Sequence, residues 1–113
     1  MTDATIDRAT FDGLVATTGS DFVRELVATF VAEAPRMLDD MRDALAKGDA
    51  ERFRRAAHSL KSNAHTFGAL KLGAMAKALE LGSFAFAKAG APVAEAADEY
   101  GRAAAELEEL ARG

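Results

Sequence analysis

Among the 113 residues of this sequence, His58 has the side chain best suited to chemistry. The apolar residues of segment 50–67 recur at the spacing of a helix, in which each residue turns by about 100°. In that repeat His58 lies about 180° from Phe67 and about 160° from Leu60. It points away from the face that would be buried, so we expect its imidazole to be exposed rather than packed in a core.

The neighbours of His58 on the same helix are cationic or small. Arg54 and Arg55 stand one turn before it, and no carboxylate lies among its neighbours. Lys61 and Ser62 stand one turn after it. An exposed imidazole in this setting is suited to carry a phosphoryl group, because a ring nitrogen can attack phosphorus and an ammonium can offset charge on the transferring oxygens. The pattern therefore favours phosphoryl chemistry at His58.

Other kinds of site fit these residues poorly. The adjacent charges would repel a metal cation, and His58 and His65 are separated by about 10.5 Å of helix rise, too far to hold one ion easily. The chain has no cysteine, no Glu-x-x-His motif, no glycine-rich nucleophile turn and no P-loop. A helical bundle that binds a metal is thus only a weak hypothesis, and we expect neither a metal nor another cofactor.

The composition favours helices and argues against strands. The chain has 27 Ala and 11 Leu but only 5 Val and 1 Ile, and strands prefer β-branched residues. Its length suits one domain, which we assign to residues 1–113. It has no cysteine, no apolar leader and no uninterrupted apolar run of about 18 residues, so we expect a cytoplasmic protein with no membrane segment.

Glycine, proline and capping residues divide the chain into helices. A short helix is predicted near 7–17, followed by a long one that Ser20 or Asp21 caps and Gly48 ends. Pro35 lies inside the long helix and should kink it, with a full break as the alternative. The apolar stripe expected along it consists of Phe22, Leu26, Phe30, Ala34, Met37/Leu38, Met41 and Leu45.

Three further helices are predicted after the long one. The first, over 50–67, is capped by Asp49 and closed by Gly68, the second runs to Gly90, and the last covers about 92–111. Inner residues expected on the last two are Leu72, Ala76, Leu79 and Phe86, then Val93, Ala97, Tyr100, Ala104, Leu107 and Ala111. Because short loops favour antiparallel neighbours, the predicted fold is all-α, an antiparallel up-down four-helix bundle with an additional short N-terminal helix. Its single core suggests a monomer.

The charge is distributed unevenly along the chain. The net charge is −4, but residues 52–71 carry five bases and no acid, which leaves −9 for the rest. Such a basic segment is either a solvated helix face or a site for an anion or an acidic partner. An acidic molecule with one short basic stretch would repel most of a phosphate backbone, which argues against nucleic acid.

A spaced motif begins at His58 and continues into the next predicted helix. It consists of His58-Ser59-Leu60-Lys61-Ser62, Gly68-Ala69, Leu72, Ala76 and Leu79-Glu80. This resembles the histidine phosphotransfer (HPt) domain of bacterial two-component phosphorelays, whose pattern is His-x-Leu-Lys-(Gly/Ser), then Gly-Ala, then a spaced Leu, a small residue and Leu-Glu. The match covers roughly 24 residues, and the predicted helices extend it over nearly the whole chain.

The resemblance implies a phosphorelay carrier. His58 would be the phosphoacceptor, through Nε2, between a histidine kinase or hybrid kinase and the receiver domain of a response regulator. Lys61 would steady the phosphoryl group, and Glu80 would accept a hydrogen bond from Nδ1–H and so orient the ring. The chain would have no ATP-dependent kinase activity of its own, and Mg²⁺ would be bound by the receiver.

The resemblance also implies a docking face for the receiver. Ser62 matches a position that the family keeps small, because a bulky side chain one turn from His58 would block the receiver. His65 replaces a more usual small residue, so it either tunes partner choice or pH response or is a rival acceptor. The residues expected on this face are Arg54, Arg55, Ser62, His65 and Lys77.

An HPt-like module that binds and regulates a kinase or receiver without carrying phosphate is the alternative. The joint presence of His58, Lys61, Ser62 and Glu80 argues against it, because a binding module would not need the nucleophile.

Overall fold

The computed structural model describes residues 5–87 and 91–112, and within these ranges it contains helices and no strands. The all-α prediction is therefore confirmed. The helices are α1 (Arg8–Thr18), α2 (Ser20–Lys47), α3 (Ala50–Phe67), α4 (Leu70–Leu81), α5 (Phe84–Ala87) and α6 (Ala91–Arg112).

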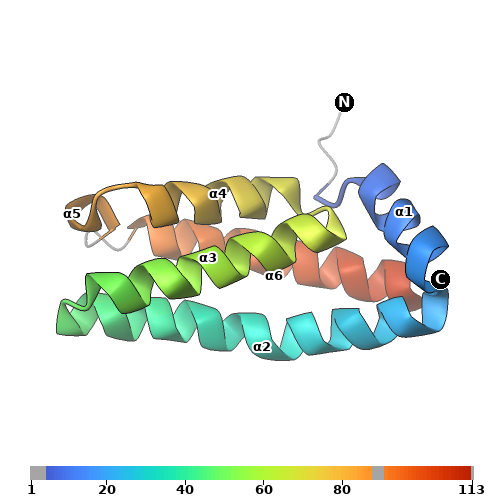
Figure 1. Ribbon diagram of the computed structural model, residues 1–113, viewed down its shortest axis with the longest axis horizontal. Coiled ribbons are helices and arrows are strands. Elements are labelled where there is room, and N and C mark those ends of the chain that lie inside the picture. The colour runs from blue at the N-terminus through green and yellow to red at the C-terminus, as the bar shows by residue number, and fades with distance from the viewer. Residues whose placement is uncertain (1–4, 88–90, 113) are drawn as a thin grey trace.

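Four of these helices form an antiparallel bundle, as predicted. α3 packs against both α2 and α4, and α6 closes the bundle against α2 and α4 (Figure 1). The short α1 lies at the end of the bundle where α3 turns into α4, and it contacts α2 and α3. This arrangement leaves the outer face of α3, next to α4, uncovered by any other helix of the described residues.

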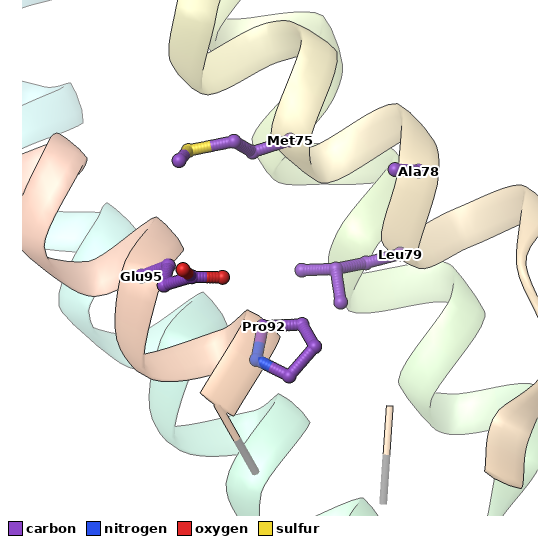
Figure 2. Close-up of a pocket in the computed structure, with 5 residues that line it drawn as sticks. All are labelled: Met75, Ala78, Leu79, Pro92 and Glu95. Atoms are coloured by element: carbon purple, nitrogen blue, oxygen red, sulfur yellow. The ribbon is translucent and has the colours of Figure 1, made fainter. Parts of the chain in front are cut away.

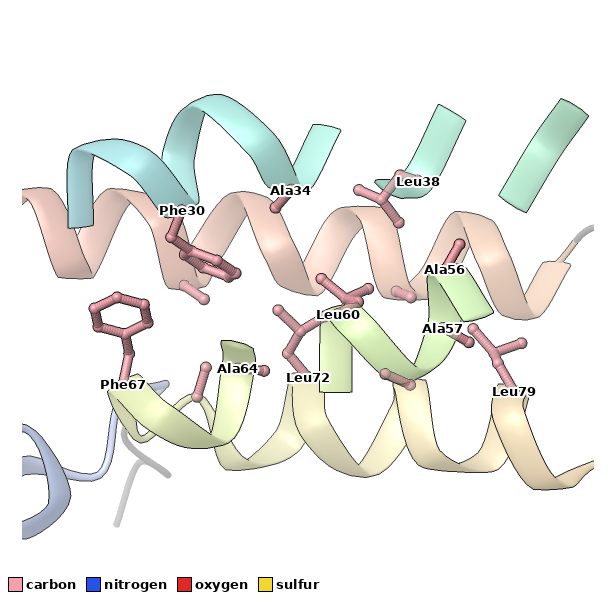
Figure 3. Close-up of a cluster of buried hydrophobic side chains, with 14 of the residues drawn as sticks. Phe30, Ala34, Leu38, Ala56, Ala57, Leu60, Ala64, Phe67, Leu72 and Leu79 are labelled. Carbon is pink, nitrogen blue, oxygen red and sulfur yellow. The ribbon is translucent and has the colours of Figure 1, made fainter. Parts of the chain in front are cut away.

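Large and small apolar residues from facing helices alternate in the core. Phe30 and Leu38 of α2 meet Leu60 of α3 and Leu72 of α4 (Figure 3), and all of them are buried. Alanines between the large residues let the helices approach closely. Burying each such Leu stabilises the fold by about 1.5–3 kcal/mol relative to leaving it exposed.

The two helical hairpins turn at glycines, as predicted. Gly48 after α2 has φ 72° and Gly68 after α3 has φ 83°, a left-handed conformation that glycine adopts without strain. The Asp49 side chain caps α3 by accepting a hydrogen bond from the Arg52 amide. At Gly68 space is short as well, because a Cβ there would stand 2.7 Å from the Asp7 carbonyl oxygen. The Asp7 amide in turn donates to the Gly68 carbonyl at 2.7 Å, which attaches α1 to the α3–α4 turn.

The start of α2 differs from the prediction. The helix begins at Ser20 after Gly19, and no side chain caps it, so the predicted Ser20 or Asp21 cap is wrong. Val23 is buried while Phe22 is 49% exposed. With about 100° per residue, Val23 lies about 20° from Phe30 and Phe22 about 80° from it, so the valine shares the buried direction.

The remainder of the predicted α2 stripe is largely confirmed. Leu26, Met37 and Leu45 are only half-buried, and Val27 and Ala44 join the buried row. The buried members that were predicted are Phe30, Ala34, Leu38 and Met41.

Pro35 lies inside α2 without breaking it, so the alternative of a full break is wrong. A proline has no amide hydrogen, which deprives the carbonyl four residues earlier, that of Val31, of its usual donor. The hydroxyl of Tyr100 on α6 donates to this carbonyl at 2.9 Å. Burial, and then the charge of Glu108, raise the pKa of Tyr100, so its hydroxyl stays protonated and able to donate.

The helix after Gly68 is shorter than predicted. α4 ends at Leu81, Gly82 is extended, and the four-residue α5 follows, because glycine disfavours continuation of a helix. Phe84 of α5 packs edge-on against Phe53, with 5.9 Å between ring centroids. The side chain of Phe86, expected on the inner face, lies outside the described part of the structure, as do residues 88–90.

The last helix, α6, begins at Ala91, one residue before the predicted start. Val93, Ala104 and Leu107 are buried as predicted, whereas Ala97, Tyr100 and Ala111 are only half-buried. Ala96, Glu99 and Ala103 are buried instead, because the buried face is rotated from the predicted one. Glu99 is 2% exposed and its carboxylate accepts a hydrogen bond from Arg102 at 2.9 Å.

Candidate functional site

The apolar face of α3 determines which way His58 points. Phe53, Leu60, Ala64 and Phe67 are buried against α2 and α4, as the spacing predicts. His58 lies on the opposite side, and 57% of its side chain is exposed. Its ring is therefore open to an approaching molecule.

A carboxylate from the neighbouring helix holds the imidazole. Because α4 runs antiparallel to α3, its C-terminal end lies beside the middle of α3, and Glu80 Oε2 is 2.7 Å from His58 Nδ1. The other oxygen, Oε1, is 2.8 Å from Lys61 Nζ. Glu80 and Lys61 are shielded from solvent, with 18% and 23% of their side chains exposed. One half-buried carboxylate thus bridges the exposed imidazole and a lysine.

The charge on Glu80 fixes which ring nitrogen carries the proton. The hydrogen bond from Lys61, and then that from His58, lower the pKa of Glu80 despite the opposing effect of burial. The ionised carboxylate can only accept hydrogen bonds, so we assign the proton of the neutral ring to Nδ1, which donates to Oε2. Nε2 then keeps a free lone pair on the exposed side of the ring.

The other residues predicted for the site do not join the hydrogen bonds of this triad. Arg54, Ser62 and His65 are exposed on α3, and Lys77 is exposed on α4. Arg55 is exposed too, and it pairs with Glu51 of the same helix at 3.2 Å. The structure therefore brings together His58, Lys61 and Glu80, and arranges the remaining five on the surface of α3 and α4.

Gly73 was missed by the sequence reasoning, yet it lies in contact with a predicted site residue. A Cβ built on Gly73 would stand 2.4 Å from Nε2 and from Cδ2 of His65. A glycine in the middle of a helical segment was the available signal, because such a glycine often marks a close approach.

Two further features of the described residues concern metal binding and cavities. In residues 5–87 and 91–112, no group of three or more His, Cys, Asp or Glu side chains could hold a metal ion. A cavity of about 110 Å³ between α4 and α6 is lined by Met75, Ala78, Leu79, Pro92 and Glu95 (Figure 2). Its lining includes no member of the triad. None of the helices described is both long and apolar enough to cross a bilayer.

Comparison with protein families identifies the chain. The model of the Hpt domain matches residues 25–113, a range that begins within α2 and includes His58, Lys61 and Glu80. Neither the curated proteins nor the solved structures contain a match to this sequence. Hpt domains are histidine phosphotransfer modules of two-component phosphorelays that interact with kinases and receiver domains and are not themselves kinases. With most of its length matched by this model, the chain belongs to the Hpt domain family.

Proposed function

We propose that this protein carries a phosphoryl group on His58 between a histidine kinase or hybrid kinase, or a receiver-domain phosphoaspartate, and the receiver domain of a response regulator. The observation that carries the proposal is the exposed His58 ring with its Nδ1 2.7 Å from Glu80. A ring held in this way presents Nε2, the atom that must form the new bond.

The transfer balances with the residues of this site. The Nε2 lone pair attacks phosphorus, the bond from phosphorus to the aspartate oxygen breaks, and the aspartate leaves as a carboxylate. The ring becomes a phosphoimidazolium that keeps its Nδ1 proton, and the negative Glu80 stabilises the new positive charge. Transfer to the next receiver is the same step in reverse, with a fresh aspartate carboxylate as the nucleophile.

Lys61 has two tasks in this proposal. It holds Glu80 in place through the 2.8 Å contact with Oε1, and its ammonium lies on the same side of α3 as His58, where it offsets charge on the phosphoryl oxygens. The chain itself would need no cofactor, since Mg²⁺ would be supplied by the receiver. Arg54, Arg55, Ser62, His65 and Lys77 would form the docking face.

The test is phosphotransfer from a panel of phosphorylated receivers and hybrid kinases to wild type, His58→Gln and His65→Gln. Acid-labile phosphate is mapped by mass spectrometry. We expect label on wild type and on His65→Gln and none on His58→Gln. Loss of label only in His65→Gln would move the acceptor by two turns and contradict the proposal.

Stability measurements separate a chemical role from a structural one. His58→Gln should change the free energy of unfolding by less than about 0.5 kcal/mol, because the side chain is exposed. Leu60→Ala, two residues away in the core, should lower it by about 2–5 kcal/mol. If instead no donor labels the wild type while a receiver or kinase binds it, the binding module without phosphate is the better description.

The monomeric state, the cytoplasmic location and the assignment of residues 1–113 to one domain stay predictions.

A further inference from the structure

The contact between His65 and Gly73 shapes the surface beside His58. A Cβ at position 73 would be 2.4 Å from two atoms of the His65 ring, far inside van der Waals contact. The ring therefore lies against α4 in space that any other residue at position 73 would need. Gly73 is buried there, although a glycine inside a helix is less favourable than alanine.

This contact is the neighbour of the His58–Glu80 pair along the same two helices. His65 follows His58 by seven residues on α3, and Gly73 precedes Glu80 by seven on α4, so each spacing keeps both members on one face. Because the helices are antiparallel, the two contacts form successive layers separated by about 10.5 Å of helix rise. The direction in which His65 points therefore affects the surface that a partner of His58 must approach.

A receiver domain must bring its phosphorylated aspartate to bonding distance of His58 Nε2, which requires close approach of the two surfaces. Ser62, which is small and exposed, lies between His58 and His65. With the His65 ring lying against α4, the ring does not project from this part of α3 toward an approaching receiver. An outward-pointing imidazole would add a ring in the path of the receiver.

We propose that Gly73 is a positioning residue, which seats the His65 ring against α4 and so keeps the face beside His58 open to the receiver domain. The inference rests on the proposed function and assigns a role to a residue outside the His58, Lys61 and Glu80 triad. It also argues against His65 as a rival acceptor through Nε2, since that atom faces α4 at Gly73, where a Cβ would stand 2.4 Å from it.

The experiment compares Gly73→Ala with Gly101→Ala as a matched control. Gly101 is an exposed glycine within α6, and a Cβ there would meet nothing within 4 Å. Transfer from a phosphorylated receiver is measured as a function of receiver concentration. Gly73→Ala should raise the half-saturating concentration about tenfold, because a displaced ring obstructs docking, and should leave the rate at saturation unchanged. Gly101→Ala should behave as wild type.

A double variant separates the ring from the backbone. Adding Gly73→Ala to His65→Ala should leave the half-saturating concentration at the value of His65→Ala alone, because no ring is left to displace. The rate at which diethyl pyrocarbonate modifies His65 should rise in Gly73→Ala. Thermal unfolding should show no loss of stability in Gly73→Ala, since alanine favours helix.

Three outcomes would overturn the inference while leaving the proposed function intact. They are wild-type half-saturation in Gly73→Ala, a half-saturating concentration that rises further when Gly73→Ala is added to His65→Ala, and an unchanged rate of His65 modification. Failure of every donor to label the wild type would instead contradict the proposed function, and the inference with it.

Discussion

Glu80 contacts an imidazole and an ammonium with its two oxygens, and this division governs the chemistry proposed for His58. Oε2 accepts from the imidazole and Oε1 faces the Lys61 ammonium. Lys61 keeps the carboxylate ionised, and the ionised carboxylate fixes the tautomer of the ring. The three side chains therefore act as a unit, and a change at one is felt by the other two.

Glu80→Gln tests this dependence. The amide is nearly the same shape, but it cannot stabilise the phosphoimidazolium by charge. By analogy with carboxylates that orient metal-binding histidines, we expect phosphotransfer to slow by about 10- to 100-fold. The measurement is single-turnover transfer from a saturating phosphorylated receiver. Unchanged transfer in Glu80→Gln, with His58 still labelled, would show that the ring needs no carboxylate.

The sequence predicts the parts of this triad unequally. The exposure of His58 follows from helical spacing on α3 alone, because the residues that oppose it are in the same helix. The contact with Glu80 joins positions 22 residues apart in different helices, and no local period predicts it. Only the resemblance to the HPt pattern suggested it. The contact between Gly73 and His65 was not predicted because it depends on how closely α3 and α4 approach.

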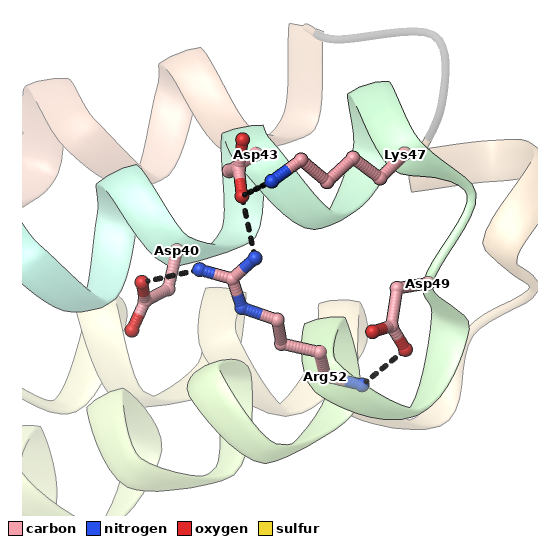
Figure 4. Close-up of polar contacts among 5 residues, drawn as sticks. All are labelled: Asp40, Asp43, Lys47, Asp49 and Arg52. Carbon is pink, nitrogen blue, oxygen red and sulfur yellow. Dashed lines mark hydrogen bonds and ion pairs between the residues drawn. The ribbon is translucent and has the colours of Figure 1, made fainter.

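At the scale of elements, the α2–α3 hairpin is cross-linked by charge near its turn. The Arg52 guanidinium reaches from α3 to Asp40 and Asp43 on α2, and Lys47 also pairs with Asp43 (Figure 4). The hydrogen bond from Arg52, and then that from Lys47, lower the pKa of Asp43 below its ordinary value of 3.8. This carboxylate therefore stabilises the fold when it is ionised.

The sign of that shift gives a pH prediction. A lowered folded-state pKa contributes stability that is present above pH 3.8 and lost as the pH falls through the folded value. Asp43→Asn should therefore be less stable than wild type near neutral pH, and the difference should shrink as the pH falls below 3.8. Urea denaturation at several pH values measures this.

Asp39→Asn is the matched control, because Asp39 pairs only within α2, with Arg42 at 3.0 Å, among the contacts the structure describes. A similar loss in both variants would mean that the cross-link between helices contributes nothing of its own.

The predicted helix boundaries failed where tertiary contacts or glycine override local preference. At the start of α2, Val23 and Val27 are buried in place of the predicted Phe22. Both valines lie closer than Phe22 to the side of the helix on which Phe30 is buried. α4 ends at Leu81, before the extended Gly82, whereas the predicted helix runs to Gly90. The turns at Gly48 and Gly68 were predicted correctly because a glycine directly after a helical segment is a local signal for a left-handed C-terminal residue.

For the whole molecule, exposed cations that form no ion pair among the described residues lie on α3 and α4 of an otherwise acidic protein. Residues 52–71 carry five bases and no acid within a chain of net charge −4. Arg54 is exposed on α3 and Lys77 on α4, and neither forms an ion pair in the described ranges. Their charges are thus free to attract an acidic partner surface.

Association with a receiver should therefore depend on salt. Raising ionic strength from about 50 mM to about 500 mM shortens the screening length to a few ångströms, so the half-saturating receiver concentration should rise. The rate at saturation should stay nearly constant. Arg54→Ala with Lys77→Ala should flatten this dependence, and Arg112→Ala, at the end of α6, should not. Equal slopes for all three proteins would place the attraction elsewhere.

The hydrogen bond from Tyr100 to Val31 restricts the order in which this sequence can evolve. If the Tyr100 hydroxyl were lost first, the Val31 carbonyl would lose this hydrogen bond while Pro35 still deprives it of its usual amide donor. Replacing Pro35 first restores an amide to that carbonyl and makes the hydroxyl dispensable. Substitution at position 35 is thus permissive for substitution at position 100, whereas the reverse order passes through a less stable intermediate. Among descendants of such a chain, replacement of Pro35 should therefore precede replacement of Tyr100.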